Sequence, residues 1–128
     1  EMDMSASYKP VLLLAILDAA DDRGRAKLSE VVHNFRRFYE RRREAGLVVE
    51  APKARMARVE SMDETEVQQT MLGMPFRKFE IRRYLVYDRD VAYVRFDHAL
   101  WRQLKPDDLA KLRASCEESI AKYYERLA

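Results

Sequence analysis

The sequence predicts a single α+β domain that is mainly helical, contains one small β-hairpin and ends in two further helices. Apolar residues recur at helical spacing along most of the 128 residues, and this period gives way to aromatic and β-branched residues between 79 and 96. A chain of this length buries one hydrophobic core. We therefore expect one domain over residues 1–128, with a helix-and-hairpin core over about 7–96 and a helical extension over about 97–128.

The first helix is expected over residues 7–20. Ser7 is placed to cap it, and Pro10 is tolerated because the amides of the first turn have no partner within the helix. The run Val11–Leu17 is apolar nearly all round, which indicates a helix buried on several sides. Residues 25–28 are predicted to be short and extended.

The second helix is expected from a cap at Ser29 to a stop at Gly46. Its buried stripe has the i, i+3, i+4, i+7 spacing and consists of Leu28, Val31, Val32, Phe35 and Phe38. Residues 47–60 are the least regular part. A short strand over 47–49 is one interpretation of them, followed by a loop or irregular turn after Pro52.

A third helix is expected over about 62–72, because Ser61 to Glu64 match the Ser-x-x-Glu capping box and Gly73 follows as a stop. Residues 79–96 then predict a hairpin with the three-residue loop 88–90. Three tyrosines on it can stack on bases, although strand spacing also suits core or cross-strand pairs; they are Tyr84, Tyr87 and Tyr93.

Two helices complete the chain. Asp97 can cap a short helix whose Trp101 serves as a core residue or as a lid over the hairpin, and Pro106 opens the last helix. This last helix has one apolar stripe, for packing on the core or on a partner helix: Leu109, Leu112, Cys116, Ile120, Tyr123 and Leu127.

The order of these elements is that of a winged helix-turn-helix core followed by two C-terminal helices. In that arrangement the third helix enters the major groove and the hairpin touches the DNA backbone. Three carboxylates at the start of the third helix argue against DNA contact there, because they repel phosphate; they are Asp63, Glu64 and Glu66.

Charge supports a nucleic-acid partner in part. The net charge is only +2, but residues 25–60 hold ten basic and five acidic side chains. We expect phosphate contacts from Lys53, Arg55, Arg58, Arg77, Lys78, Arg82, Arg83 and Arg89. Gln68 and Gln69 are placed to reach base edges, since a Gln amide can pair bidentately with adenine. A second candidate surface consists of Arg36, Arg37, Arg41 and Arg43, for which a solvated helix face is the plain alternative.

No catalytic or cofactor motif is present. His33, His98 and Cys116 lack zinc-ligand spacing, and there is no glycine-rich phosphate loop. A metal-dependent nuclease is the remaining enzyme hypothesis, but the carboxylates Glu80, Asp88 and Asp90 lack a strand Lys to complete such a site. We expect no enzymatic activity, no cofactor and no metal.

Compartment follows from two simple features. A single Cys excludes an internal disulfide framework and fits a reducing cytoplasm. The longest apolar run, Val11–Leu17, is too short to span a bilayer or to act as a signal peptide. We expect a cytoplasmic protein with no membrane partner.

Several segments together resemble an accessory domain that accompanies bacterial DEAD/DEAH-type helicases and restriction-type HNH endonucleases. The resemblance covers nearly the whole chain and rests on Tyr8–Asp18, Gly24, Phe35, Phe38, Tyr39, Arg42, Glu50, Met74–Phe79, Phe96, Leu100, Trp101, Leu104, Tyr123 and Tyr124. That family more often has Asn before Pro-Phe, where this chain has Met74. In such proteins the nuclease and ATPase motifs lie in other domains, so the resemblance implies a non-catalytic module that handles DNA.

These features together predict a DNA-binding accessory module that contacts mainly the backbone, in a bacterial helicase or restriction (defence) context. Its expected partners are DNA, of a form the sequence leaves open, and a helicase or nuclease domain of the same or a companion chain. The alternative is a protein-docking or oligomerisation module, including a homodimer, that uses the C-terminal helix.

Overall fold

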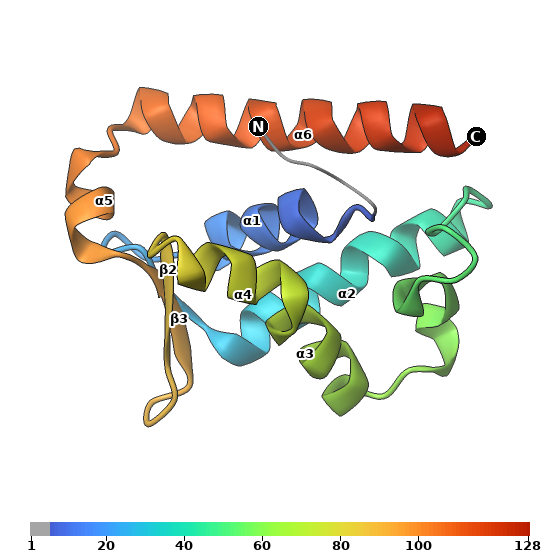
Figure 1. The fold of residues 1–128 in the computed structure, drawn as a ribbon, viewed down its shortest axis with the longest axis horizontal. Helices are drawn as coiled ribbons and strands as arrows, with labels where there is room; N and C mark the ends of the chain where they lie inside the picture. Colours follow the sequence, from blue (N-terminus) through green and yellow to red (C-terminus); the bar gives the residue numbers. More distant parts are fainter. Residues whose placement is uncertain (1–5) are drawn as a thin grey trace.

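The structure is a computed structural model and describes residues 6–128 (Figure 1). It confirms the predicted class, because the described chain is mainly helical with a small antiparallel sheet. The elements, in chain order, are α1 (Tyr8–Ala19), β1 (Arg25–Lys27), α2 (Leu28–Glu44), the 3₁₀ helix η1 (Arg55–Ser61), α3 (Glu64–Leu72), α4 (Met74–Ile81), β2 (Leu85–Asp88), β3 (Tyr93–Phe96), α5 (His98–Gln103) and α6 (Pro106–Leu127).

The sheet within residues 6–128 has three antiparallel strands in the order β1-β3-β2. The predicted extended segment after Gly24 is β1, and it pairs with β3 so that Ala26 lies opposite Val94. On the other side of β3, Leu85 lies opposite Phe96. Residues Ala26, Leu85, Val94 and Phe96 are all buried, so one face of the sheet covers the core.

Helix α1 is the centre of the core. It packs against α2 and α6, and Val11, Leu12 and Ile16 are almost completely buried. This position explains why its sequence is apolar nearly all round. The stripe on α6 packs on this same core, since Cys116 and Ile120 are buried there.

The irregular segment 47–54 contains no strand, so the strand interpretation of 47–49 is wrong. Side chains occupy the carbonyls that a strand would use: Arg42 Nε donates to Val48 (2.6 Å) and the Tyr124 hydroxyl donates to Val49 (2.6 Å). These bonds fasten the segment to α2 and α6. The expected irregular turn is present around Lys53, but Arg55 and Arg58, which were also expected on it, lie in the 3₁₀ helix η1.

Three predicted caps differ in the structure. Helix α2 begins at Leu28, one residue before Ser29. Helix α3 begins at Glu64, because Asp63 and Glu66 form the capping box (2.8 and 3.0 Å), whereas Ser61 donates to the Arg58 carbonyl (3.0 Å) and closes η1. Ser7 is at the N-cap of α1, but its hydroxyl makes no cap bond.

The predicted hairpin start at residue 79 is also wrong, because residues 74–81 are helical. Pro75 stands in the first turn of α4, where its fixed φ favours a helix, and Phe76 packs into the core. The helix ends where Arg83 adopts φ 63° and the Tyr84 amide donates to the Phe79 carbonyl (2.9 Å). The hairpin therefore begins at residue 85, and its loop covers residues 89–92 rather than 88–90.

Candidate nucleic-acid interface

The ten predicted site residues fall into separate groups on the fold. Arg77 and Lys78 lie on α4, Arg82 and Arg83 in the turn that follows it, and Arg89 in the hairpin loop. The group Lys53, Arg55 and Arg58 lies in and before η1, which Figure 1 shows at the opposite end of the molecule from the hairpin. The structure thus groups Arg77, Lys78, Arg82 and Arg83 on α4 and the turn after it, and it leaves the η1 group apart from them.

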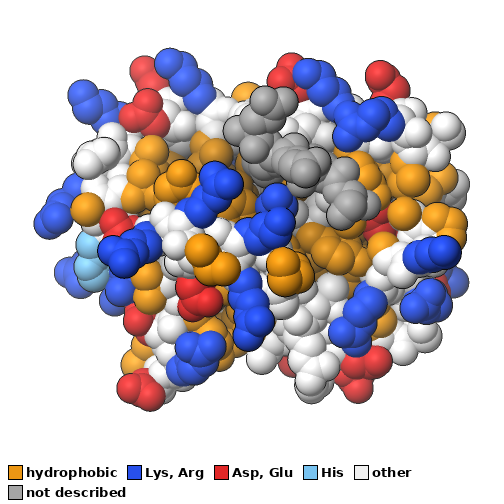
Figure 2. Space-filling model, in the orientation of Figure 1, with side chains coloured by type: hydrophobic (Ala, Val, Ile, Leu, Met, Phe, Trp, Pro, Cys, Tyr) orange, Lys and Arg blue, Asp and Glu red, His pale blue; other side chains and the backbone are white. Residues whose placement is uncertain are grey.

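Helix α4 turns one face outward. Met74, Arg77, Lys78 and Ile81 have the spacing i, i+3, i+4, i+7 and are all exposed, with Ile81 78% and Met74 63% accessible. Figure 2 shows Lys and Arg side chains gathered over α4, with apolar and some acidic side chains among them. We call this face, with Arg82 and Arg83 beyond it, the α4 face.

The cations of the α4 face are not neutralised within residues 6–128. None of the eight predicted basic residues forms an ion pair there. Of the acids in the same stretch, Asp88 is bound by Arg95 Nε (2.9 Å), and Glu80 is half-buried. Unpaired cations on one helix produce a local positive potential, although the whole chain carries a net charge of only +2.

Arg89 lies in the hairpin loop and packs on the hairpin itself. Its guanidinium lies over the Tyr87 ring, 4.7 Å from the centroid, in a cation–π contact. Tyr87 in turn meets Phe76 edge to face, and Tyr93 lies under Arg25. Of the three tyrosines that could stack on bases, Tyr84 is the one left exposed, at 44%.

Helix α3 does not present a cationic surface. Gln69 is exposed, but Gln68 is half-buried in a depression of about 330 Å³ between α3, the start of α2 and the hairpin loop, beside Lys27 and Glu64. Asp63 and Glu66, which argued against DNA contact at this helix, are the capping box of α3. In chain order, the helix that directly precedes the hairpin is α4 and not α3.

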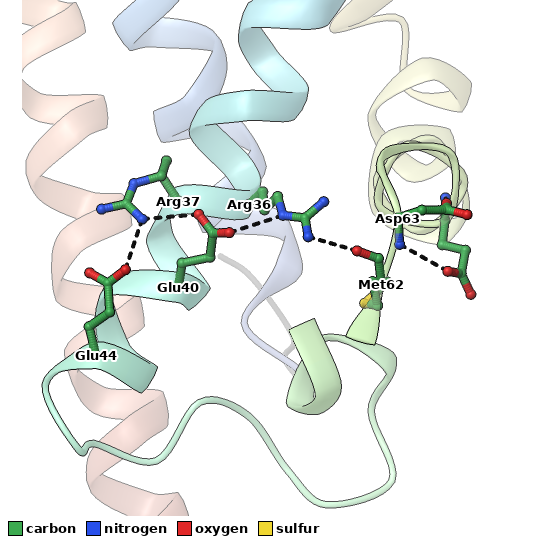
Figure 3. Close-up of polar contacts among 7 residues, drawn as sticks. Arg36, Arg37, Glu40, Glu44, Met62 and Asp63 are labelled. Carbon is green, nitrogen blue, oxygen red and sulfur yellow. Dashed lines mark hydrogen bonds and ion pairs between the residues drawn. The ribbon is translucent and has the colours of Figure 1, made fainter. Parts of the chain in front are cut away.

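The second candidate surface, on α2, is largely neutralised by carboxylates (Figure 3). Arg36 donates to Glu40 (3.1 Å) and to the Met62 carbonyl (2.7 Å), and Arg37 donates to Glu40 (3.0 Å) and Glu44 (3.2 Å). Burial acts to raise the pKa of Glu40, but the bonds from Arg37 and Arg36 outweigh it and hold this pKa below its ordinary value.

These α2 arginines have a structural role. Arg36 ties α2 to the chain between η1 and α3, and Arg43 pairs with Glu60 of η1 (3.1 Å). Arg41 is exposed and forms no ion pair with any residue of 6–128. Of the four arginines in this second candidate surface, Arg41 alone lacks an ion pair with the described residues, whereas all five cations between residues 77 and 89 lack one, so the α4 face is the stronger phosphate-binding candidate.

A groove of about 1040 Å³ lies between α6 and the elements α1, α4 and α5. Two predicted site residues, Lys78 and Arg82, line it. They are joined by three cations that the sequence does not reveal as site residues: Lys9, Lys122 and Arg126. Lys9 is on α1 and the other two are on α6, so only the fold brings them together and no sequence spacing connects them.

The remaining chemistry-bearing residues stay apart. His33 and His98 are exposed on different helices, and Cys116 is buried, which raises the pKa of its thiol to about 11. Within residues 6–128, no three His, Cys, Asp or Glu side chains come together as metal ligands. None of the helices in the same range has the length and apolarity that a membrane crossing needs.

No protein-family model, curated protein or solved structure matches this chain in the comparisons made.

Proposed function

We propose that this protein is a DNA-binding module with a winged-helix-like core, in which α4 meets the DNA and the β2–β3 hairpin is the wing. The element order supports the proposal: α1, β1, α2, α3 and α4 precede the hairpin, and β1 completes a sheet of order β1-β3-β2. In winged helices, a helix close before the hairpin is the one that enters the groove.

The observation that carries the proposal is the α4 face. Arg77 and Lys78 are exposed one turn from Met74 and Ile81, and no carboxylate among the described residues pairs with them. An outward cationic helix face gains free energy from phosphates by releasing their counterions. Exposed apolar side chains lie between the cations and can contact thymine methyl groups. A surface helix that faces only solvent has no need of such exposed apolar side chains.

Contacts are proposed to be mainly with the DNA backbone. Arg82, Arg83 and Arg89 extend the cations from α4 to the hairpin, and phosphate contacts position a protein without reading sequence. Gln69 is the exposed amide on the neighbouring helix and is our candidate for a base contact. We assign the module no catalytic step.

The proposed setting is that of an accessory domain beside a helicase or nuclease in a bacterial defence system. The resemblance of segments such as Tyr8–Asp18 and Met74–Phe79 to such domains supports this setting. The alternative, docking or self-association through the apolar stripe of α6, has less support, because Cys116, Ile120 and Tyr123 of that stripe are buried within this chain.

The test is fluorescence anisotropy with a labelled duplex of random sequence at low salt. We expect the wild-type chain to bind it and the variant R77E/K78E to bind at least tenfold more weakly, for every sequence tried. The matched control R102E/K111E makes the same charge change at two exposed residues outside the α4 face and should stay within twofold of wild type. Equal effects of the two variants, or no binding by a folded wild type, would refute the proposal.

A further inference from the structure

The groove beneath α6 is walled by four helices. Helix α1 contributes Leu13, α4 contributes Phe79, and α6 contributes Leu112, while α5 and the residues after it close one end. Its volume of about 1040 Å³ is at the upper limit of ordinary ligand sites, which measure roughly 300–1,000 Å³. It has room for more than a single small metabolite.

The rim of the groove is strongly cationic. Five basic side chains line it: Lys9, Lys78, Arg82, Lys122 and Arg126. Glu118 is the one carboxylate among the lining residues, and it makes a long contact with Lys122 (3.9 Å) on an exposed face. Such exposed pairs are weak, so the rim retains most of its positive charge.

The floor of the groove is apolar and partly aromatic. Phe79 is half-buried and Phe96 is buried, and both lie among leucines that include Leu100. Tyr84 lines the same groove while remaining 44% exposed. A ligand suited to this site combines several negative charges with flat apolar surface.

We propose that this groove binds an unpaired stretch of the DNA that the α4 face holds. Phosphates of a single strand would lie on the five rim cations, and its unstacked bases would face Tyr84 and the apolar floor. A duplex keeps its bases inside the helix and offers only phosphates to such a surface. This inference rests on the proposed function and adds the form of DNA that it takes.

The path from the α4 face to the groove is continuous in charge. Lys78 and Arg82 belong to both surfaces, whereas Arg77 and Arg83 do not line the groove and Lys122 and Arg126 lie on α6. A strand leaving the end of a duplex on α4 therefore meets phosphate-binding side chains all the way to α6. The two surfaces can be altered separately through the cations that they do not share.

The test compares three labelled DNAs: a blunt duplex, the same duplex with a single-stranded overhang, and the single strand. We expect wild type to bind the overhang DNA more tightly than the blunt duplex. Variant K122E/R126E should bind the overhang DNA and the single strand about tenfold more weakly than wild type does. Its affinity for the blunt duplex should stay within twofold of the wild-type value. Y84A should show the same pattern, because an unpaired base that stacks on Tyr84 contributes binding energy, whereas the bases of a duplex are not free to stack on it.

Variant R77E/R83E is the matched control, because it changes the two α4-face cations that do not line the groove. It should lower the affinity for the blunt duplex. Circular dichroism should first show that K122E/R126E is folded. The groove proposal is overturned if this variant binds all three DNAs as tightly as wild type does, or if its affinity falls equally for all three. It is also overturned if that variant loses only the binding of a labelled acidic Glu-Leu-Phe peptide, which would make the groove a peptide site. Failure of wild type to bind the blunt duplex would instead count against the α4 face.

Discussion

The indole ring of Trp101 lies directly over Gly24. A Cβ added to Gly24 would come within 2.5 Å of the ring carbon Cδ2, and Gly24 has φ +75°, a conformation that favours glycine. Trp101 also stacks on Phe96 (centroids 5.2 Å apart) and donates its Nε1 hydrogen to the Asp22 carbonyl (3.0 Å). This contact fastens α5, and through it the start of α6, to the turn before β1.

Gly24→Ala should therefore destabilise the fold by about 3 kcal/mol, from backbone strain and from overpacking against the ring. Gly46→Ala is the control, because Gly46 has φ +72° with open space around it, and it should cost only about 1 kcal/mol. The measurement is the free energy of unfolding in urea. Equal losses for the two variants would show that the Trp101 contact contributes nothing.

Glu50 holds distant parts of the chain together, because its buried carboxylate joins Ser7, at the start of α1, to α6. It accepts hydrogen bonds from the Ser7 amide (3.0 Å), the Ser7 hydroxyl (2.5 Å), the Ala51 amide (2.7 Å) and the Tyr123 hydroxyl. Glu50→Ala leaves these buried donors without that acceptor and should cost about 3 kcal/mol of unfolding free energy. Glu60→Ala, which removes an exposed carboxylate paired with Arg43, should cost less than about 1 kcal/mol. A small loss for Glu50→Ala would contradict this account.

Stability should decrease at alkaline pH. Burial raises the pKa of Tyr124 from 10.0 to about 12 and also raises the pKa of Tyr39. Because the folded state keeps phenol protons that the unfolded chain releases, this contribution is intact below pH 10 and is lost between about pH 10 and 12. Urea titrations from pH 7 to 11.5 should show a plateau and then a decline, with a shallower decline in Tyr124→Phe. A variant as steep as wild type would exclude this tyrosine as a cause.

Cys116 should resist thiol reagents in the folded protein. Its side chain is fully buried, and burial raises the thiol pKa to about 11, so little thiolate is present or accessible at pH 8. We expect alkylation by iodoacetamide, followed by mass spectrometry, to be at least a hundredfold slower than in urea-unfolded protein. Glu50→Ala should accelerate it, because opening becomes more frequent. Fast labelling of the native wild type would show that α6 is not held on the core.

Much of the fold is readable from local residue chemistry. Asp97 does accept the cap bond from the Leu100 amide (3.1 Å), Pro106 does open α6, and Gly46 does end α2 with φ +72°. The error at residues 79–81 arose because Phe79 and Ile81 also suit a strand, whereas burial of Phe76 and the place of Pro75 favour a helix. Tertiary contacts, and not local propensity, determine the secondary structure of that segment.

Some candidate site residues can be predicted from local sequence, and others require the fold. Arg77 and Lys78 can be predicted as candidate site residues from the sequence, because cations close to a hairpin are a local feature. The neutralisation of Arg36 and Arg37 has a partial signal in their spacing of four and three residues from Glu40, but the bond from Arg36 to the Met62 carbonyl requires the fold. The groove cations Lys9, Lys122 and Arg126 come from α1 and α6, which lie far apart in the sequence, so sequence spacing does not relate them.

The central claim is that the α4 face binds DNA phosphates, and a salt series of duplex binding tests it most directly. If the five cations between residues 77 and 89 contact phosphates, the logarithm of the binding constant should fall against the logarithm of salt concentration with a slope of about −3 to −5. Variant R77E/K78E should reduce the magnitude of that slope by about 2. A flat salt dependence in the folded wild type, or an unchanged slope in the variant, would contradict the claim.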